Sequence, residues 1–418
     1  MSERSDMPAP PRRALWLSYG SGLLSMGQMD LLQFIVPLWA LHLGANATEV
    51  GIVAGARSVL PFILAIHGGV LMDRLGTRRI MAASAISMIV AAPLFPGLPW
   101  VPALVVLQLV TGYATTIAWV GSQTVIAQVC RGDTGYLGKY NFAGRIGTFL
   151  APILMGLLWD FTNPWLTFLF VGLWAAALLA ISLATEDPAP PEGEAAGAPE
   201  PAGAPPNPSR AARLRAVLPK GSDYLSTFAL LLIPAIAISI SGSFLRNTTS
   251  AVQGSIYVVY LNDIGLTGTA IGALFAAIEG ASAIGALLAG RVARRFAAYT
   301  LLLGTTAAGI FLINATPLLG GIFALLFAAQ VLRGLIQGVN QPVLFGIQAR
   351  AAGPHRQGAT VALRVTVNRF VSMTLPPIMG IVADTAGIEA SFYLLGGVLL
   401  AMTAGLAVLI RFAPAGEA

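Results

Sequence analysis

Long apolar stretches alternate with short polar links along this chain of 418 residues. A helix needs about 20 mostly apolar residues to cross a bilayer, and twelve stretches have about that length or more. They lie at residues 14–43, 48–72, 79–97, 100–129, 137–161, 165–185, 224–261, 267–290, 297–314, 317–349, 357–385 and 388–411. The pattern predicts an all-α integral membrane protein with twelve transmembrane helices.

One polar segment is much longer than the other links. Residues 186–223 are rich in proline, which predicts a disordered cytoplasmic linker. This linker divides the chain into an N-terminal bundle of six helices at 14–185 and a C-terminal bundle of six at 224–411. Residues 1–13 and 412–418 are the predicted cytoplasmic ends.

Two apolar stretches, one in each bundle, repeat the same four residues at the same spacings of seven, four and four. The first copy holds Arg145, Pro152, Gly156 and Asp160, and the second holds Arg369, Pro376, Gly380 and Asp384. Membrane proteins with two similar halves are most often transporters, in which the halves rock about a site held between them. Because proline interrupts helical hydrogen bonding, Pro152 and Pro376 are expected to bend their two helices at matched depth.

The composition excludes a water-soluble fold and offers no enzyme chemistry. Hydrophobic residues make up 56% of the chain and charged residues 10%, with a mean hydropathy of +0.77, whereas soluble domains carry about 25% charged residues. Cys130 is the single cysteine, and no phosphate-binding loop, nucleophile elbow or zinc motif is present. We therefore expect no enzymatic activity, no cofactor and no metal.

Lys and Arg are distributed unevenly between the links. All those in the links fall in even-numbered ones, as Arg78, Arg131 and Arg291 do. Because basic loops stay on the cytoplasmic side, both termini are expected in the cytoplasm, with the protein in an inner (plasma) membrane of bacterial type. The same rule accounts for the net charge of +6 without a nucleic-acid partner.

The link after the second predicted helix carries a dense charge cluster. Residues 69–79 read GVLMDRLGTRR, and this segment resembles the loop signature of the major facilitator superfamily, a glycine followed by Asp-Arg-x-Gly-x-Arg-Arg. Residues 287–295 hold a decayed copy in which Gly290 replaces the aspartate. The resemblance covers the whole chain. It implies a monomer with two pseudo-symmetric six-helix bundles around a cavity that opens alternately to either side.

The same cluster has a physical interpretation of its own. An aspartate adds nothing to positive-inside insertion, so the charges favour a cytoplasmic gate that latches the bundles in one state; purely topogenic charge is the alternative. The gate candidates are Gly69, Asp73, Arg74, Gly76, Arg78 and Arg79.

The fifth predicted helix is rich in glycine and proline. Residues 144–156 read GRIGTFLAPILMG, which is similar to the helix-5 signature of proton-coupled exporters in this superfamily. Ala151 stands where that signature has glycine, and Leu157 replaces its last glycine. The resemblance implies export, while close packing of small residues is the alternative explanation.

Charges deep in the apolar stretches are the main candidates for function, because each is costly to bury. The acids are Asp30 and Glu279, of which Asp30 is the first candidate for proton coupling, with a passive structural role as the alternative. The arginines, interpreted as substrate-binding residues, are Arg57, Arg145, Arg246, Arg333 and Arg369.

The deep charges are also unbalanced and inverted between the halves. Five arginines against two acids leave positive charge that an acidic substrate would neutralise, with hydration and backbone carbonyls as the alternative. Asp30 and Arg246 occupy counterpart helices, as do Arg57 and Glu279, so these pairs are predicted to meet or to exchange partners. Structural salt bridges at the bundle interface are the other interpretation.

Three amides share one face of the tenth predicted helix. Gln337, Asn340 and Gln341 are spaced by three and four residues. They are substrate-binding candidates, although amides also serve as packing contacts between membrane helices.

Together these features predict a secondary transporter that exports an amphiphilic organic compound with an acidic group in exchange for protons. The alternative is a proton-coupled importer or exchanger of an organic anion, and a non-transporting membrane sensor is more remote. The expected partners are a small anionic substrate, protons and the lipid bilayer.

Overall fold

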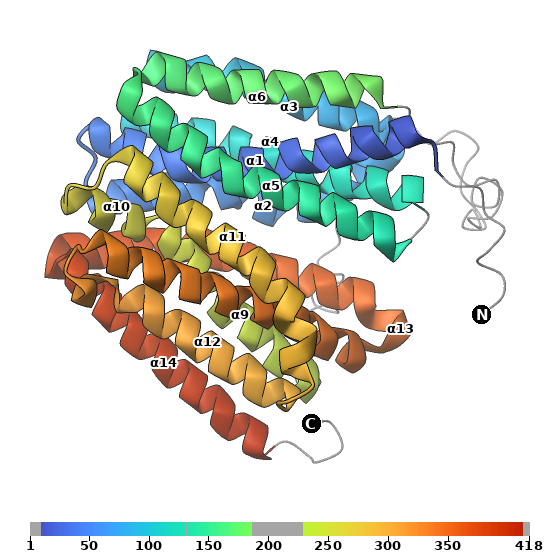
Figure 1. Cartoon of the computed structure of the whole chain (residues 1–418), viewed down its shortest axis with the longest axis vertical. Coiled ribbons are helices and arrows are strands. Elements are labelled where there is room, and N and C mark those ends of the chain that lie inside the picture. The colour runs from blue at the N-terminus through green and yellow to red at the C-terminus, as the bar shows by residue number, and fades with distance from the viewer. Residues whose placement is uncertain (1–9, 131–132, 186–228, 413–418) are drawn as a thin grey trace.

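The computed structural model describes residues 10–130, 133–185 and 229–412, and within them the chain is helical without strands. The N-terminal half contains α1 (Arg12–His42), α2 (Ala47–Leu75), α3 (Thr77–Gly97), α4 (Val101–Cys130), α5 (Thr134–Phe161) and α6 (Pro164–Ala184). The C-terminal half contains η1 (Ala229–Leu232), α9 (Pro234–Gln253), α10 (Ile256–Asp263), α11 (Gly268–Ala293), α12 (Ala298–Asn314), η2 (Thr316–Leu319), α13 (Phe323–Ala386) and α14 (Ile388–Phe412). Figure 1 shows the two halves as adjacent bundles. The predicted linker at 186–223 lies outside the described residues.

The predicted all-α membrane fold is confirmed. Ten helices among the described residues are long and apolar enough to cross a membrane. The N-terminal helices begin and end within three residues of the predicted positions, because their polar links and caps are sharp. Asn46, for example, caps α2 by accepting the backbone N–H of Glu49 at 2.9 Å.

Two predicted helix boundaries in the C-terminal half are wrong. The stretch 224–261 is broken between α9 and α10, where Ser255 adopts non-helical φ and ψ of −140° and −99°. Conversely, 317–349 and 357–385 join as the single element α13. This element folds back on itself, because Arg364 lies over the Phe345 ring at 4.1 Å, whereas nineteen residues of straight helix would span about 28 Å.

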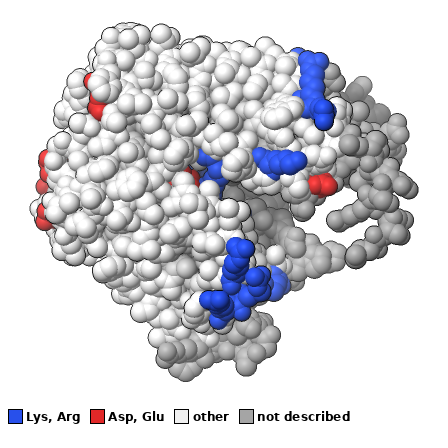
Figure 2. Space-filling model, in the orientation of Figure 1, with Lys and Arg blue, Asp and Glu red and all other residues white. Residues whose placement is uncertain are grey.

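The two halves share an apolar core toward one end of the molecule. The largest buried cluster contains residues of both halves, and Phe34 of α1 meets Phe275 of α11 with ring centroids 5.6 Å apart. α5 and α11 lie together toward the left of Figure 1 and diverge toward the right. The space-filling view is hollowed between the halves on that right-hand side, where α1 begins (Figure 2).

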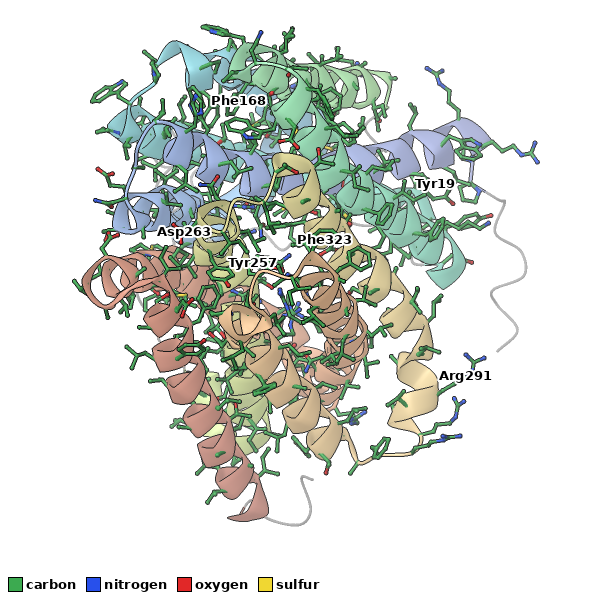
Figure 3. All side chains as sticks on the ribbon, turned by 60° about the vertical axis from the view of Figure 1, so that its left-hand side comes forward. Tyr19, Phe168, Tyr257, Asp263, Arg291 and Phe323 are labelled. Atoms are coloured by element: carbon green, nitrogen blue, oxygen red, sulfur yellow. The ribbon has the colours of Figure 1, made fainter. Side chains whose placement is uncertain are left out.

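Charged side chains are also distributed unevenly between the closed and the hollowed side of the molecule (Figure 2). In Figure 2 the basic groups gather on the hollowed side, whereas most acidic groups lie at the opposite edge. Asp263, which precedes α11, and Arg291, in the last turn of α11, lie at opposite ends of the molecule (Figure 3). The basic end is therefore the one that the sequence predicts to face the cytoplasm.

Candidate functional site between the halves

A cavity of about 180 Å³ lies between the two halves, where α1 and α2 face α9 and α13. Its N-terminal wall includes Gln33, Arg57 and Ser58, and its C-terminal wall includes Asn247 and Arg369. The wall thus draws on both halves and contains two arginines. No Asp or Glu is among the described residues that line this cavity, so the arginine charges face each other without a carboxylate in the wall.

Backbone contact and one amide fix the position of Arg57. Gly112 of α4 packs directly on the Arg57 backbone, where a Cβ would clash with the carbonyl oxygen. The guanidinium Nη1 of Arg57 donates to Oε1 of Gln33 at 3.0 Å. Arg369, from the opposite half, is within electrostatic range of Arg57. Arg57 is held in this way, and together with Arg369 it offers guanidinium groups of the kind that bind a carboxylate or phosphate.

The wall opposite Arg57 is held by amides and hydroxyls within the C-terminal half. The Asn247 amide of α9 donates to the Asn368 carbonyl at 2.8 Å and to the Ser372 hydroxyl at 3.0 Å. The Ser243 hydroxyl donates to the Asn368 side-chain oxygen at 3.0 Å. These contacts tie α9 to α13, so this wall of the cavity moves as part of one half.

Glu279 forms an ion pair with Arg145. The sequence had suggested Arg57 as its partner. Nη1 of Arg145 in α5 lies 2.6 Å from Oε2 of Glu279 in α11, so the ion pair joins the two halves. The Thr148 hydroxyl adds a longer contact of 3.4 Å to the same oxygen. Asp30 lies within electrostatic range of Glu279, Arg57 and Arg145.

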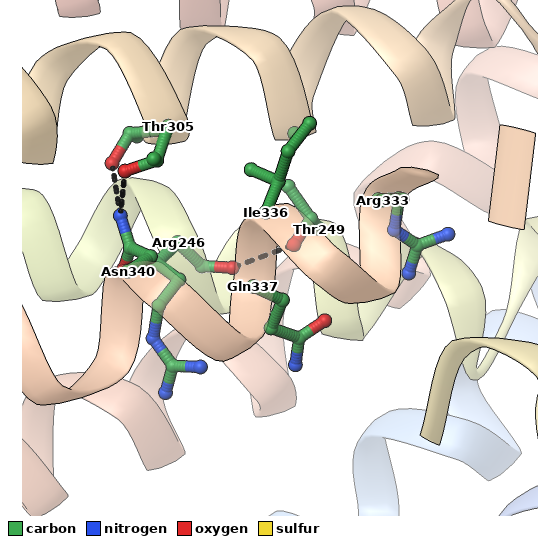
Figure 4. A pocket seen from close by; sticks show the side chains of 9 residues that line it. Arg246, Thr249, Thr305, Arg333, Ile336, Gln337 and Asn340 are labelled. Atoms are coloured by element: carbon green, nitrogen blue, oxygen red, sulfur yellow. Dashed lines mark hydrogen bonds between the residues drawn. The ribbon is translucent and has the colours of Figure 1, made fainter. Parts of the chain in front are cut away.

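The remaining two arginines line a separate pocket within the C-terminal half. Arg246 of α9 and Arg333 of α13 border it, and the Gln337 amide stands between them in the view of Figure 4. Arg333 is only 2% exposed and donates to Gln330 at 2.8 Å and to Gln253. The Nε of each arginine is buried without a hydrogen-bond partner among the described residues. The predicted arginine set is therefore distributed over three places.

The three predicted amides also differ in their surroundings. Asn340 donates to the hydroxyls of Thr305 and Thr306 at 2.8 and 3.1 Å, which ties α13 to α12 (Figure 4). Gln337 lines the pocket of Arg246 and Arg333, and Gln341 is half-buried. Asn340 borders the same pocket, but its amide also joins α13 to α12.

The equal spacing in the two repeats places an aspartate at each of the two seams between the halves, α5 against α11 and α2 against α13. Asp160, at the end of α5, accepts the backbone N–H groups of Gly268 and Thr269 at the start of α11, at 2.8 and 2.7 Å. Asp384, at the end of α13, accepts those of Ala47 and Thr48 at the start of α2, at 3.1 and 2.8 Å. The sequence reasoning identified the repeat but missed these contacts.

A second repeat in the sequence could have predicted the contacts of Asp160 and Asp384. Thr48 and Gly51 near the start of α2 recur as Thr269 and Gly272 near the start of α11, both 221 residues later. Gly51 packs on the Pro376 carbonyl and Gly272 on the Pro152 carbonyl. The four segments therefore meet in two matching pairs.

At the predicted cytoplasmic gate, Gly76 alone connects α2 to α3. Its φ of +88° lies in the left-handed region that glycine adopts readily. Gly69 lies within α2, and the side chains of Asp73 and Arg74 are outside what the structure describes. Arg79 is exposed beside Arg78.

The sequence profile of the Major Facilitator Superfamily matches residues 19–246 and 239–418. The fold is similar to that of the nucleoside transporter NupG, with a TM-score of 0.74, 12% identity, and 96% of this chain and all of that one covered. A POT family transporter in complex with a thioalcohol-conjugated peptide gives a TM-score of 0.73 at 12% identity, with 96% of each chain covered.

A bacterial homologue of the human lysosomal transporter Spinster, in an inward-facing and unoccupied conformation, gives a TM-score of 0.67 at 15% identity, with 97% of each chain covered. No curated protein sequence matches the chain. At these identities the solved structures carry the fold alone.

Proposed function

Because the chain belongs to the Major Facilitator Superfamily, and is accordingly a secondary transporter, we propose that it moves an organic compound with an acidic group together with protons. The observation that carries this proposal is the pair of arginines, Arg57 and Arg369, in the cavity between the halves. An anion bound there would neutralise two charges that come from opposite halves.

A comparison of the two seams strengthens the assignment to Arg369. Arg145 and Arg369 are counterparts in the repeat, and Arg145 finds its carboxylate in Glu279. The counterpart of Glu279 is Ser58, because each stands seven residues after the matched glycines Gly272 and Gly51. Arg369 therefore faces a cavity that offers a serine in place of a carboxylate. A substrate anion would supply the charge that the protein lacks at this position.

The Arg145–Glu279 pair suggests how protons are coupled to the substrate. A carboxylate that loses its cationic neighbour takes up a proton more readily. An anion that draws Arg145 away from Glu279, or that shields Arg57 from Asp30, would therefore promote protonation of the acid. Anion and proton then bind in the same state and cross together.

This linkage favours proton symport, and hence uptake of an organic anion, over the export predicted from α5. The glycines of the exporter-like segment serve close packing: Gly144 lies against Met26, and Gly147 against the Leu23 carbonyl, both of α1. Such packing suits transport in either direction. Export by antiport is the second candidate, supported by the sequence of that segment.

The test is a proton-flux measurement on the full chain in proteoliposomes. Acidic metabolites that raise the melting temperature of the purified protein are added outside while external pH is recorded. Under the proposal, anion addition makes the outside more alkaline, and external acid accelerates anion entry. External acidification on anion addition would support antiport instead, and anion movement without proton movement would remove the coupling.

A further inference from the structure

The starts of α2 and α11 are each capped partly by their own half and partly by the other. The first N–H groups of a helix have no partner within the helix. In α2, Asn46 accepts the N–H of Glu49, and Asp384 of the other half accepts those of Ala47 and Thr48. In α11, Thr267 accepts the N–H of Ala270 at 3.3 Å, and Asp160 of the other half accepts those of Gly268 and Thr269.

We propose that Asp160 and Asp384 are paired latches that hold the two halves closed at the acidic end of the molecule, an inference that rests on the proposed transport function. Each aspartate belongs to one half and binds backbone donors of the other, so the halves cannot part there without breaking both contacts. Negative charge at a helix start is also favoured by the helix dipole.

Beside each latch, a glycine of one half packs on the backbone of the other half. Gly156 packs on the Gly268 carbonyl, and Gly380 packs on the Ala47 carbonyl. At these two glycines backbone meets backbone, which lets the aspartates reach the helix starts. Because both copies of the repeat supply the same parts, the two latches are expected to close and release together.

The two latches differ in one hydrogen bond. The Thr48 hydroxyl donates to Asp384 at 2.5 Å, whereas the hydroxyl of Thr269, its counterpart beside Asp160, is buried without a hydrogen-bond partner among the described residues. Asp384 therefore makes one more contact across its seam than Asp160. Loss of Asp384 should consequently open this end more than loss of Asp160.

The test measures the distance between the halves and requires no substrate. In a Cys130→Ser background, spin labels at Leu98→Cys and Leu318→Cys mark exposed links of the two halves at the latched end. Pulsed electron resonance in nanodiscs should give one dominant short distance. Removing a helix cap shifts an equilibrium about two- to thirty-fold.

Asp384→Ala and Asp160→Ala should therefore each raise the ratio of long to short distances within that range, with Asp384→Ala the larger. The double variant should raise it more than about tenfold. Asp263→Ala, an acid at the same end within the C-terminal half, is the matched control and should leave the ratio unchanged.

A folded double variant with the parent's distance distribution would overturn the latch. If the double variant does not fold, the two single variants carry the same test in the same labelled background. The distance measurement uses no ligand, so the absence of proton flux in the transport assay would not contradict the latch. Likewise, an unchanged distance would not contradict the proposed substrate site.

Discussion

The two seams between the halves, α5 against α11 and α2 against α13, are alike at the acidic end and different at mid-depth. At the acidic end each seam has an aspartate on a helix start and a glycine on a backbone carbonyl. At mid-depth, Arg145 meets Glu279 in one seam, while Arg369 faces the cavity near Ser58 in the other. The aspartate and glycine contacts that both seams share hold the halves together at the acidic end. The difference between Glu279 and Ser58 leaves the cavity with arginines and no carboxylate in its described wall.

Ser58→Glu should have the largest effect, because it restores the missing symmetry. The new carboxylate would lie where Glu279 lies in the other seam and would neutralise Arg369. Binding of an acidic compound should weaken by more than about 100-fold, since a resident charge would both occupy the arginine and repel the ligand. Calorimetric titration with an acid that stabilises the parent measures the change.

The control for this substitution is Ser58→Ala, which removes the hydroxyl and adds no charge. It should bind the same acid within about threefold of the parent, as a neutral hydrogen bond contributes only about 1 kcal/mol. Equal affinities of Ser58→Glu and Ser58→Ala would show that Arg369 does not hold the substrate anion.

Arg369→Ala removes one side of the proposed site and should weaken acidic ligands by about ten- to a hundredfold, because hydrogen bonds to charged groups contribute about 1.5–3 kcal/mol. Asn340→Ala, in the same helix but bonded to α12, is the comparison and should leave affinity unchanged. The same titration distinguishes them. A loss of equal size in both variants would indicate a general loss of packing.

Glu279→Gln should separate proton movement from anion movement. Without an ionisable group beside Arg145, accumulation driven by a pH gradient should fall at least tenfold, while exchange of labelled anion across the membrane continues. Asp30→Asn should behave in the same way if both acids take part. Full accumulation by both variants would remove these acids from the coupling.

Gly51→Ala should give the smallest effect, confined to the seam. A Cβ at this position would clash with the Pro376 carbonyl, and overpacking costs about 1–3 kcal/mol. The melting temperature of the ligand-free protein should fall by a few degrees. Gly304→Ala, where a Cβ meets open space, is the control. Equal melting temperatures would mean that this seam is loosely packed.

The helices could be predicted from the sequence because apolar runs of sufficient length have few alternatives in a bilayer. The break after α9 could not, since Gly254 and Ser255, where the break falls, are residue types that also occur inside membrane helices. The length of α13 was missed for the opposite reason: residues 350–356 contain polar residues that suggest a link, yet the helix continues through them.

The site was predictable in its residue types but not in its pairing. Asp30, Glu279 and the arginines stand out because deep charges are rare. Which arginine meets Glu279 depends on the register of α5 against α11, which the sequence sets only through small glycine contacts. The Asp160 and Asp384 contacts required matching two repeats, one at helix ends and one at helix starts.

The most direct test of the central claim, that the cavity between the halves takes an acidic substrate, is a thermal-shift comparison of the parent protein with acids and their neutral amides. A ligand that binds only the folded state raises the melting temperature with its concentration above Kd. We expect a set of carboxylic or phosphoric acids to stabilise the parent, their amides to have little effect, and Ser58→Glu to abolish the difference. Stabilisation by amides or cationic amphiphiles equal to that by acids would contradict the account, because Arg57 and Arg369 would then be structural.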